Sequence, residues 1–506
     1  MRHRKTLSAA ALTIGVLTQA ALAAPGDELH KLTASDGAAG DHFGVALAIH
    51  GTTLIVGAPF DDDNGSDSGA AYLFNAQTGA QLFKLLPTDG AAGDEFGAAV
   101  TILGTTAFVG ARLDDDNGVD SGAMYLFDTT TGMQTGKLLP TDGAAGQHFG
   151  VSVAADGNTV IVGANASNPG GSAYLFDIAT QVQQHKLTEY GFNIGASFGR
   201  SVGISGNKAL VGEPDDDEIE IEAGSVYFFD VSTGDPIIKT HAYNIVQKVG
   251  YGTSIATSGD TIVIGAAASE ENCYLLDLNT ALTNHHLVQN AASGSESYGR
   301  TVSISGDLAI VSAEFRLPGG AAFIFDTNTG QELHELTQSD SVTFSQFGSA
   351  VGISGSLAVI GASLDNDSGA AAGAVYIFYA GNPVFAQQPP ASTIATLPSL
   401  PVDITALADQ TQAVTYQWRF NGAPISDTSA YSGTATDTLS IAPSSATEGA
   451  YDVVISNFDG STISDSSTLA VINPLPADIN GDGIVDTADL GILIGSFGMM
   501  TPGGGM

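Results

Sequence analysis

The chain has 506 residues, and its 54 acidic and 15 basic side chains give a formal net charge of −39. This length is enough for about two or three domains with sizeable buried cores. The acidity argues against nucleic acid as a partner, because proteins bind polyanions through Lys and Arg. The single cysteine, Cys273, excludes a disulfide within the chain.

The N-terminus has the pattern of a secretory signal peptide. Basic residues near the start precede an apolar run from Ala9 to Leu22, and the small-residue pattern Ala-Leu-Ala stands at 21–23. We expect residues 1–23 to be removed on export, so that the mature protein is secreted, either extracellular or associated with the cell surface. Losing the three basic residues of this segment changes the formal charge to −42. No later apolar run is long enough for a membrane span.

A unit of about 50 residues recurs seven times in the next part of the chain. Each unit has an aromatic-glycine pair, a short strand, a second apolar run, a variable loop, an aromatic-rich strand and, usually, a strand ending in Lys-Leu or a similar pair. Four short strands in such a unit are typical of a β-propeller blade. The aromatic-glycine pairs, which we assign to core packing, begin at Phe43, Phe96, Phe149, Phe198, Tyr251, Tyr298 and Phe347.

The two ends of the array predict how it closes. A strand of the Lys-Leu type precedes every aromatic-glycine pair, but none follows the seventh aromatic strand at 375–378. The first such strand, near Leu29 to Leu32, should therefore complete the seventh unit and leave no open sheet edge. We predict an all-β fold in which residues 28–380 form a seven-bladed β-propeller closed by an N-terminal strand.

The repeated motifs resemble the FG-GAP repeats of integrin α-subunit propellers and their bacterial relatives. The resemblance is carried by Phe-Gly, then by Gly-Ala-Pro at 57–59, and then by the pattern Gly-x-x-Tyr-x-Phe. Only the first unit keeps the full Gly-Ala-Pro. The resemblance implies a propeller fold, a role in adhesion or ligand binding, and calcium bound by the loop between the second and third strands.

Two of these loops are strongly acidic, with "DDDNGSDSG" at 61–69 and "DDDNGVDSG" at 114–122. Neither loop fits the calcium register of the family. Clustered carboxylates are nevertheless suitable for a hard cation that takes about six to eight oxygen ligands. The alternative is that Asp, Asn, Gly and Ser simply form solvated turns. The candidate calcium ligands are Asp61, Asp63, Asp67, Asp114, Asp116 and Asp120.

A second domain follows a proline-rich linker at 381–401, which overlaps its start. Residues 387–472 resemble an immunoglobulin-like β-sandwich, with Trp418 at the position of the core tryptophan and Tyr451 at the position of the tyrosine corner. Val453 stands where the disulfide cysteine of such a domain belongs. We therefore expect an apolar contact in place of the disulfide.

The segment "DINGDGIVDTAD" at 478–489 has the spacing of an EF-hand-like calcium loop. A helix is expected to follow to residue 497, before a tail at 498–506. The module resembles one type I dockerin repeat, which implies a cohesin-like or surface partner, although dockerins normally carry two such loops. The predicted calcium ligands are Asp478, Asn480, Asp482, the Ile484 carbonyl, Asp486 and Asp489.

The sequence contains no His-x-x-x-His or phosphate-loop motif. Active sites assembled from distant loops leave no such motif, so an enzymatic role stays open. We expect a secreted, calcium-binding adhesion or ligand-binding protein whose propeller recognises a protein or glycan. The alternatives are a carbohydrate-active enzyme, a polysaccharide hydrolase or lyase, carried by the dockerin-like tail, and a structural surface protein with no specific ligand.

Overall fold

The computed structural model describes residues 26–167, 170–190, 197–242, 249–267, 273–290, 297–340, 343–381, 385–396, 401–408, 414–444, 446–456 and 461–472. The predicted signal peptide and the predicted calcium loop with its helix lie outside these residues. No helix is present in the described part of the chain. Accordingly, none of the described segments is a helix long and apolar enough to cross a bilayer.

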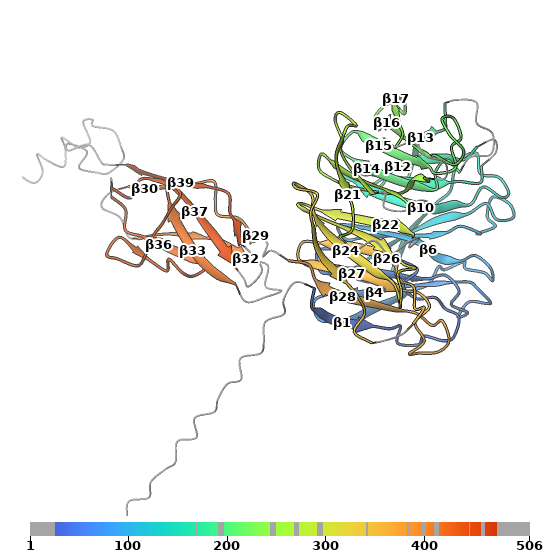
Figure 1. Ribbon diagram of the computed structural model, residues 1–506, viewed down its shortest axis with the longest axis horizontal. Coiled ribbons are helices and arrows are strands. Elements are labelled where there is room, and N and C mark those ends of the chain that lie inside the picture. The colour runs from blue at the N-terminus through green and yellow to red at the C-terminus, as the bar shows by residue number, and fades with distance from the viewer. Residues whose placement is uncertain are drawn as a thin grey trace, which may run out of the picture.

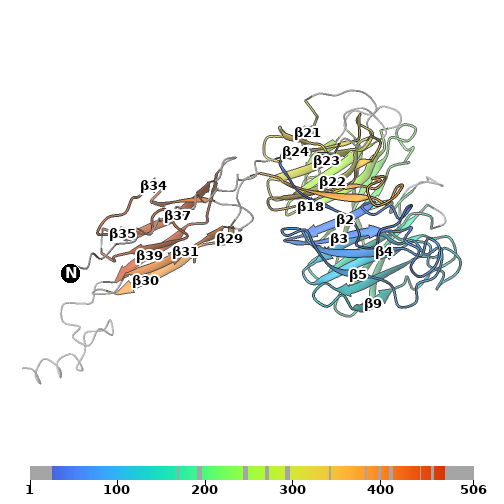
Figure 2. The same cartoon turned by 90° about the horizontal axis from the view of Figure 1, so that it is seen from below.

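Antiparallel sheets of four strands follow one another along the chain, and seven of them lie within the described residues 26–381 (Figures 1 and 2). The strands of the first four sheets are β2 (Ala46–His50), β3 (Thr53–Ala58), β4 (Ala70–Asn75) and β5 (Ala80–Leu85); β6 (Phe96–Leu103), β7 (Thr106–Ala111), β8 (Ala123–Asp128) and β9 (Gln134–Leu138); β10 (Phe149–Asp156), β11 (Thr159–Ala164), β12 (Ser172–Asp177) and β13 (Gln183–Leu187); and β14 (Ser201–Ser205), β15 (Lys208–Glu213), β16 (Ser225–Asp230) and β17 (Pro236–Thr240).

The remaining three sheets repeat this order, except that the last one takes its fourth strand from the N-terminus. Their strands are β18 (Tyr251–Ser258), β19 (Thr261–Ala266), β20 (Cys273–Asp277) and β21 (Thr283–Leu287); β22 (Tyr298–Ser305), β23 (Leu308–Ala313), β24 (Ala321–Asp326) and β25 (Glu332–Leu336); and β26 (Phe347–Ser354), β27 (Leu357–Ala362), β28 (Ala374–Tyr379) and β1 (Glu28–Leu32).

The sheets resemble propeller blades in their strand order and in their mutual contacts. Within each sheet the strands pair in chain order, up and down. The first strands of neighbouring sheets contact one another in a closed cycle, from β2 through β6, β10, β14, β18 and β22 to β26 and back to β2. Side chains of all seven first strands line one central channel.

Strand β1 closes the cycle. It pairs antiparallel with β28, with Lys31 opposite Tyr376 and Leu32 opposite Val375. The count of Lys-Leu strands predicts this pairing, because the seventh unit has no fourth strand of its own. The pairing covers the edge of β28 that would otherwise face solvent.

The repeated motif residues pack each sheet against the next. Phe43 is fully buried and meets the rings of Tyr72 and Phe74 edge-on, at centroid distances of 5.5 and 5.8 Å. A Cβ atom built on Gly57 would lie 2.0 Å from the carbonyl oxygen of Gly97 in the neighbouring sheet. Backbone therefore touches backbone between sheets, which only glycine permits. The core role predicted for the aromatic-glycine pairs is confirmed by their burial.

The described residues of 385–472 form sheets of two, three and six strands. Their strands are β29 (Phe385–Gln387), β30 (Ser392–Thr396), β31 (Val402–Thr405), β32 (Leu407–Ala408), β33 (Thr415–Phe420), β34 (Ala423–Pro424), β35 (Tyr431–Ser432), β36 (Thr438–Ile441), β37 (Gly449–Ser456), β38 (Ser461–Ile463) and β39 (Ser467–Ile472). Trp418 is buried opposite Val453, and its Nε1 donates to the Thr436 carbonyl at 2.8 Å. The Tyr451 hydroxyl donates to the Thr447 carbonyl at 2.7 Å.

We predict that a mature chain beginning at Thr33 is less stable than one beginning at Gly26. The shorter chain lacks β1, so the ladder to β28 is lost and the edge of β28 is exposed. The expected result is a lower melting temperature and self-association, measured by calorimetry and light scattering. If the chain that begins at Thr33 is monomeric and has an unchanged melting temperature, the closing role of β1 is contradicted.

Candidate functional site

Each of the two predicted calcium loops meets a lysine from the last strand of its own sheet. In the first sheet, Lys84 Nζ lies 2.8 Å from Asp36, 3.0 Å from Asp61 and 2.5 Å from Asp63. The Tyr72 hydroxyl donates to Asp61 at 2.8 Å and to Asp36 at 3.0 Å. We call this arrangement a lysine cluster. The ammonium group lies among the carboxylates and relieves their mutual repulsion.

The lysine cluster recurs around the cycle in complete or reduced form. The second and seventh sheets repeat it in full, the fourth sheet keeps two carboxylates, and the third keeps one. The corresponding groups are Lys137 with Asp89, Asp114, Asp116 and Tyr125; Lys31 with Asp340, Asp365, Asp367 and Tyr376; Lys239 with Asp216, Glu218 and the ring of Tyr227; and Lys186 with Asp142 and the ring of Tyr174.

The hydrogen bonds in the first cluster favour the charged forms of Lys84 and Asp36. Burial alone would lower the pKa of Lys84, but its hydrogen bonds to Asp36, Asp63 and Asp61 outweigh burial and raise that pKa above the ordinary value. Burial tends to raise the pKa of Asp36, whereas the Lys84 and Tyr72 hydrogen bonds lower it below the ordinary value. The charged forms of Lys84 and Asp36 are therefore favoured at neutral pH.

The structure brings together only some of the carboxylates predicted to bind calcium. Asp61 and Asp63 share Lys84, so a calcium ion there would compete with the ammonium group for the same oxygens. Asp67 instead donates its backbone N–H to Asp62 at 2.8 Å. No group of three or more His, Cys, Asp or Glu side chains in the described residues is arranged to hold a metal ion. Calcium at these loops stays a prediction.

The second loop has the same arrangement. Asp114 and Asp116 share Lys137, and the backbone N–H of Asp120 donates to Asp115 at 2.8 Å. The lysines and the carboxylates of the preceding loop were not predicted as partners of the acidic loops. A signal was present, because an Asp stands seven residues before the aromatic of four units, at Asp36, Asp89, Asp142 and Asp340.

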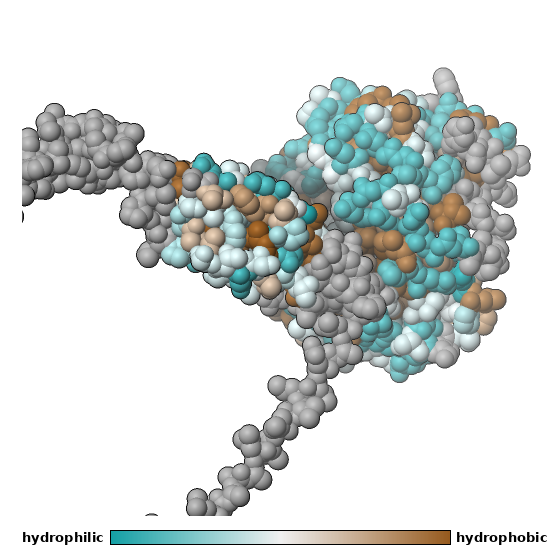
Figure 3. All heavy atoms as spheres, turned by 60° about the vertical axis from the view of Figure 1, so that its left-hand side comes forward, coloured by the Kyte–Doolittle hydropathy of each residue, from teal (hydrophilic) through white to brown (hydrophobic). Residues whose placement is uncertain are grey.

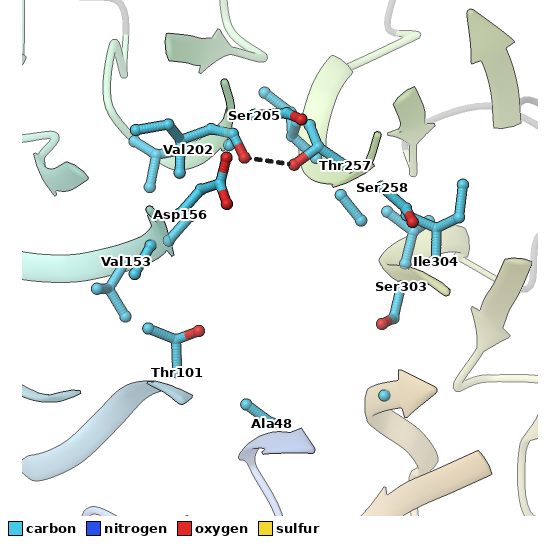
Figure 4. Close-up of a pocket in the computed structure, with 18 of the residues that line it drawn as sticks. Ala48, Thr101, Val153, Asp156, Val202, Ser205, Thr257, Ser258, Ser303 and Ile304 are labelled. Atoms are coloured by element: carbon cyan, nitrogen blue, oxygen red, sulfur yellow. Dashed lines mark hydrogen bonds between the residues drawn. The ribbon is translucent and has the colours of Figure 1, made fainter. Parts of the chain in front are cut away.

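The central channel has a volume of about 390 Å³, and Figure 4 shows polar side chains around it. These polar groups connect neighbouring sheets to one another through hydrogen bonds. The Thr257 hydroxyl donates to the Ile204 carbonyl at 2.7 Å, the Ser205 hydroxyl donates to Gly259 at 2.8 Å, and Asp156 accepts from the Gly206 N–H at 2.7 Å. The channel polar groups therefore have a structural role in joining sheets.

A second cavity, of about 280 Å³, lies on the loop face. By loop face we mean the side of the sheets that carries the loops between second and third strands and the connections into each aromatic-glycine pair. In each of four consecutive units, the residue that follows the aromatic-glycine pair lines this cavity. The other lining residues follow Gly-Ala or, in one case, directly precede an aromatic-glycine pair. The lining is Val45, Pro59, Phe60, Glu95, Ala98, Arg112, Val151 and Arg200.

Two arginines give this cavity its cationic character. Arg112 binds Glu95 Oε2 through Nε at 2.6 Å and through Nη2 at 2.5 Å. Arg200 is exposed, and within the described residues its guanidinium has no hydrogen-bond or ion-pair partner. The view of Figure 3 shows the surface over the sheets as largely hydrophilic, with hydrophobic residues in small separate patches.

Glu213 is a buried carboxyl group at the loop-face end of the fourth sheet, fully excluded from solvent. Neither of its oxygens makes a well-aligned hydrogen bond among the described residues, although the Glu189 carboxyl and the Tyr227 hydroxyl lie close to it. Burial, with the neighbouring carboxyl of Glu189, raises the pKa of Glu213 to about 9. Glu213 is therefore protonated at neutral pH and belongs to the core of the fold.

Five segments of the chain match the family model described as FG-GAP repeat, at residues 27–74, 80–127, 133–176, 182–229 and 331–378. With its cycle of four-stranded sheets, the chain is a β-propeller-like repeat protein. It contains five FG-GAP repeats. A comparison with curated proteins gives no match.

Solved structures with some likeness fall into two groups. The WD40 repeats of RRP9 share 11% identity with a TM-score of 0.47, covering 71% of this chain and all of theirs. Titin M4 shares 22% identity with a TM-score of 0.16, covering 18% of this chain and 94% of that one. The four N-terminal Ig domains of Dscam1 share 18% identity with a TM-score of 0.17, covering 18% of this chain and 26% of that one. Likeness at these levels gives no evidence on function.

We predict that Lys84→Met lowers the free energy of unfolding by about 2 kcal/mol, because it leaves the buried Asp61 without its counter-charge. Adding calcium should restore part of the loss, since the freed carboxylates can then bind the ion. Urea unfolding with and without calcium measures both effects. In the control Lys208→Met, the lysine lost donates to the neutral oxygens of Leu278 and Asn279 and has no ion pair among the described residues, so we expect a loss below about 1 kcal/mol. Equal losses in the two variants would contradict the cluster's role.

We predict that Glu213→Gln stabilises the protein at alkaline pH. The folded-state pKa of about 9 exceeds the ordinary 4.5, so the unfolded chain binds fewer protons between these values and stability falls as pH rises through that window. A neutral glutamine removes this loss. At pH 5 the free energy of unfolding should differ little between the variant and the parent protein. At pH 8 the free energy of unfolding of the variant should be higher by about 2 kcal/mol or more. The exposed Glu220→Gln should change neither value, and a pH-independent effect of Glu213→Gln would contradict the assignment.

Proposed function

We propose that this protein is a secreted adhesion or ligand-binding protein whose seven sheets form a seven-bladed β-propeller, and that the loop face of the propeller is its recognition surface. The closed cycle of first strands and the pairing of β1 with β28 support this architecture. A closed ring gives a rigid scaffold on which residues from distant parts of the chain meet at one face.

The observation that carries the proposal is the loop-face cavity. Four consecutive repeats contribute to its lining, so the cavity exists only when the repeats are assembled. It joins apolar walls with a few charged groups, which is the usual composition of a ligand site. The lysine clusters lie in the loops of the same face and hold the acidic loops in place.

The remaining modules fit the same role. Trp418, Tyr451 and Val453 make the contacts expected of an immunoglobulin-like domain, which we propose acts as a spacer. The loop at 478–489 supplies oxygen ligands at EF-hand spacing, and we propose that it binds calcium and docks the protein on a cohesin-like or other surface partner.

The proposal predicts two separable activities of the mature chain. On arrays of glycans and extracellular proteins, the chain should bind a ligand through the propeller, and Asp478→Ala with Asp482→Ala should leave that binding intact. Calorimetric titration should show that the same two substitutions abolish calcium binding by the C-terminal loop, because both remove oxygen ligands. Attachment to the cell surface should then be lost, as it should on chelation. A mature chain that binds no array component and no surface would refute the proposal.

A further inference from the structure

We infer that the loop-face cavity is a site for a single acid sugar, a pyranose that carries one carboxylate. This inference rests on the proposed function and specifies the ligand class for the same face. It depends on three features of the lining: an arginine without a counter-ion among the described residues, a carboxylate with one oxygen unused by its ion pair, and an apolar wall.

Arg200 is the feature that points to a carboxylate. Arg300 stands at the same position of its own repeat, directly after the aromatic-glycine pair, and its Nε lies 3.0 Å from the buried Glu314. Pro214 replaces that glutamate in the repeat of Arg200. The guanidinium of Arg200 therefore faces solvent without a partner in the described residues, in a chain with a large excess of acids. A guanidinium binds a carboxylate through two parallel hydrogen bonds.

The second arginine of the cavity is held in place by its own ion pair. Nε and Nη2 of Arg112 are used by Glu95 Oε2, which leaves Nη1 of Arg112 and Oε1 of Glu95 without a partner in this pair. These atoms provide one donor and one acceptor next to each other. Vicinal hydroxyl groups of a sugar can accept from the first and donate to the second.

The apolar wall suits the C–H face of a sugar ring better than a slim acidic side chain. Pro59 and Phe60 line it, and the ring of His42 supports Phe60 edge-on at a centroid distance of 5.0 Å. Val45 and Val151 complete it. A rigid aromatic wall with a few directional polar groups fixes the orientation of a small ligand.

The size of the cavity and the charge of the protein limit the ligand to a single sugar unit. About 280 Å³ lies at the small end of ligand sites, so it fits a monosaccharide unit and not a stretch of polymer. A long polyanion would also be repelled by the acidic protein, whereas a lone carboxylate meets mainly the local arginines. Because the contacts are open to solvent, binding should weaken as salt rises.

The test uses the full mature chain and two probes that differ only in the acid group, methyl glucuronoside and methyl glucoside. Saturation-transfer NMR and calorimetry should detect the glucuronoside at about millimolar affinity, and the glucoside should bind about tenfold more weakly or not at all. Arg200→Gln should weaken glucuronoside binding about tenfold and leave the melting temperature unchanged, because the side chain is exposed and unpartnered.

The matched control is Arg300→Gln combined with Glu314→Gln, which removes an arginine at the equivalent repeat position together with its partner. This control should bind the glucuronoside as the parent protein does. Equal affinity for the two sugars, equal effects of the two variants, tight binding of acetate alone, or no binding up to about 10 mM would each overturn the inference. Ligand binding on the arrays that survives Arg200→Gln would overturn this inference while leaving the proposed function intact.

Discussion

The contact of backbone with backbone between neighbouring sheets is the constraint on which the structure depends. Where Gly57 faces the carbonyl of Gly97, no side chain can intervene, and the distance between sheets is set by the main chain itself. The buried aromatic of each unit then fills the space beside this contact. Seven sheets held at one spacing close into a cycle, and both the channel and the loop-face cavity follow from that geometry.

In this acidic protein, the negative charges of several loops are balanced by lysines that lie close to them. Lysines of the sheets are placed where carboxylates converge, so that the acidic loops are held by internal ion pairs. The arginines of the loop-face cavity follow another pattern, because Arg112 has one partner and Arg200 has none among the described residues. Among the described residues, the lysines of these clusters thus hold loops, whereas Arg200 lines the loop-face cavity without an ion pair.

The sequence predicts the repeat, the strands and the closing strand because these depend on local and periodic patterns. The burial of Phe43 and the pairing of Lys31 with the strand of Tyr376 are examples. The lysine cluster could not be predicted in the same way, since Lys84 and Asp36 are 48 residues apart and meet only through the sheet arrangement. The cavity was missed for the same reason, because each repeat contributes only one to three of its residues and none of them forms a local motif.

The pairing of β1 with β28 also governs the order of events when the chain is made. Glu28–Leu32 is synthesised hundreds of residues before Ala374–Tyr379, its only sheet neighbour among the described strands. Strand β1 therefore has no sheet partner until nearly all of the repeats have been synthesised. Closure of the cycle can form only late, after the last repeat has left the ribosome.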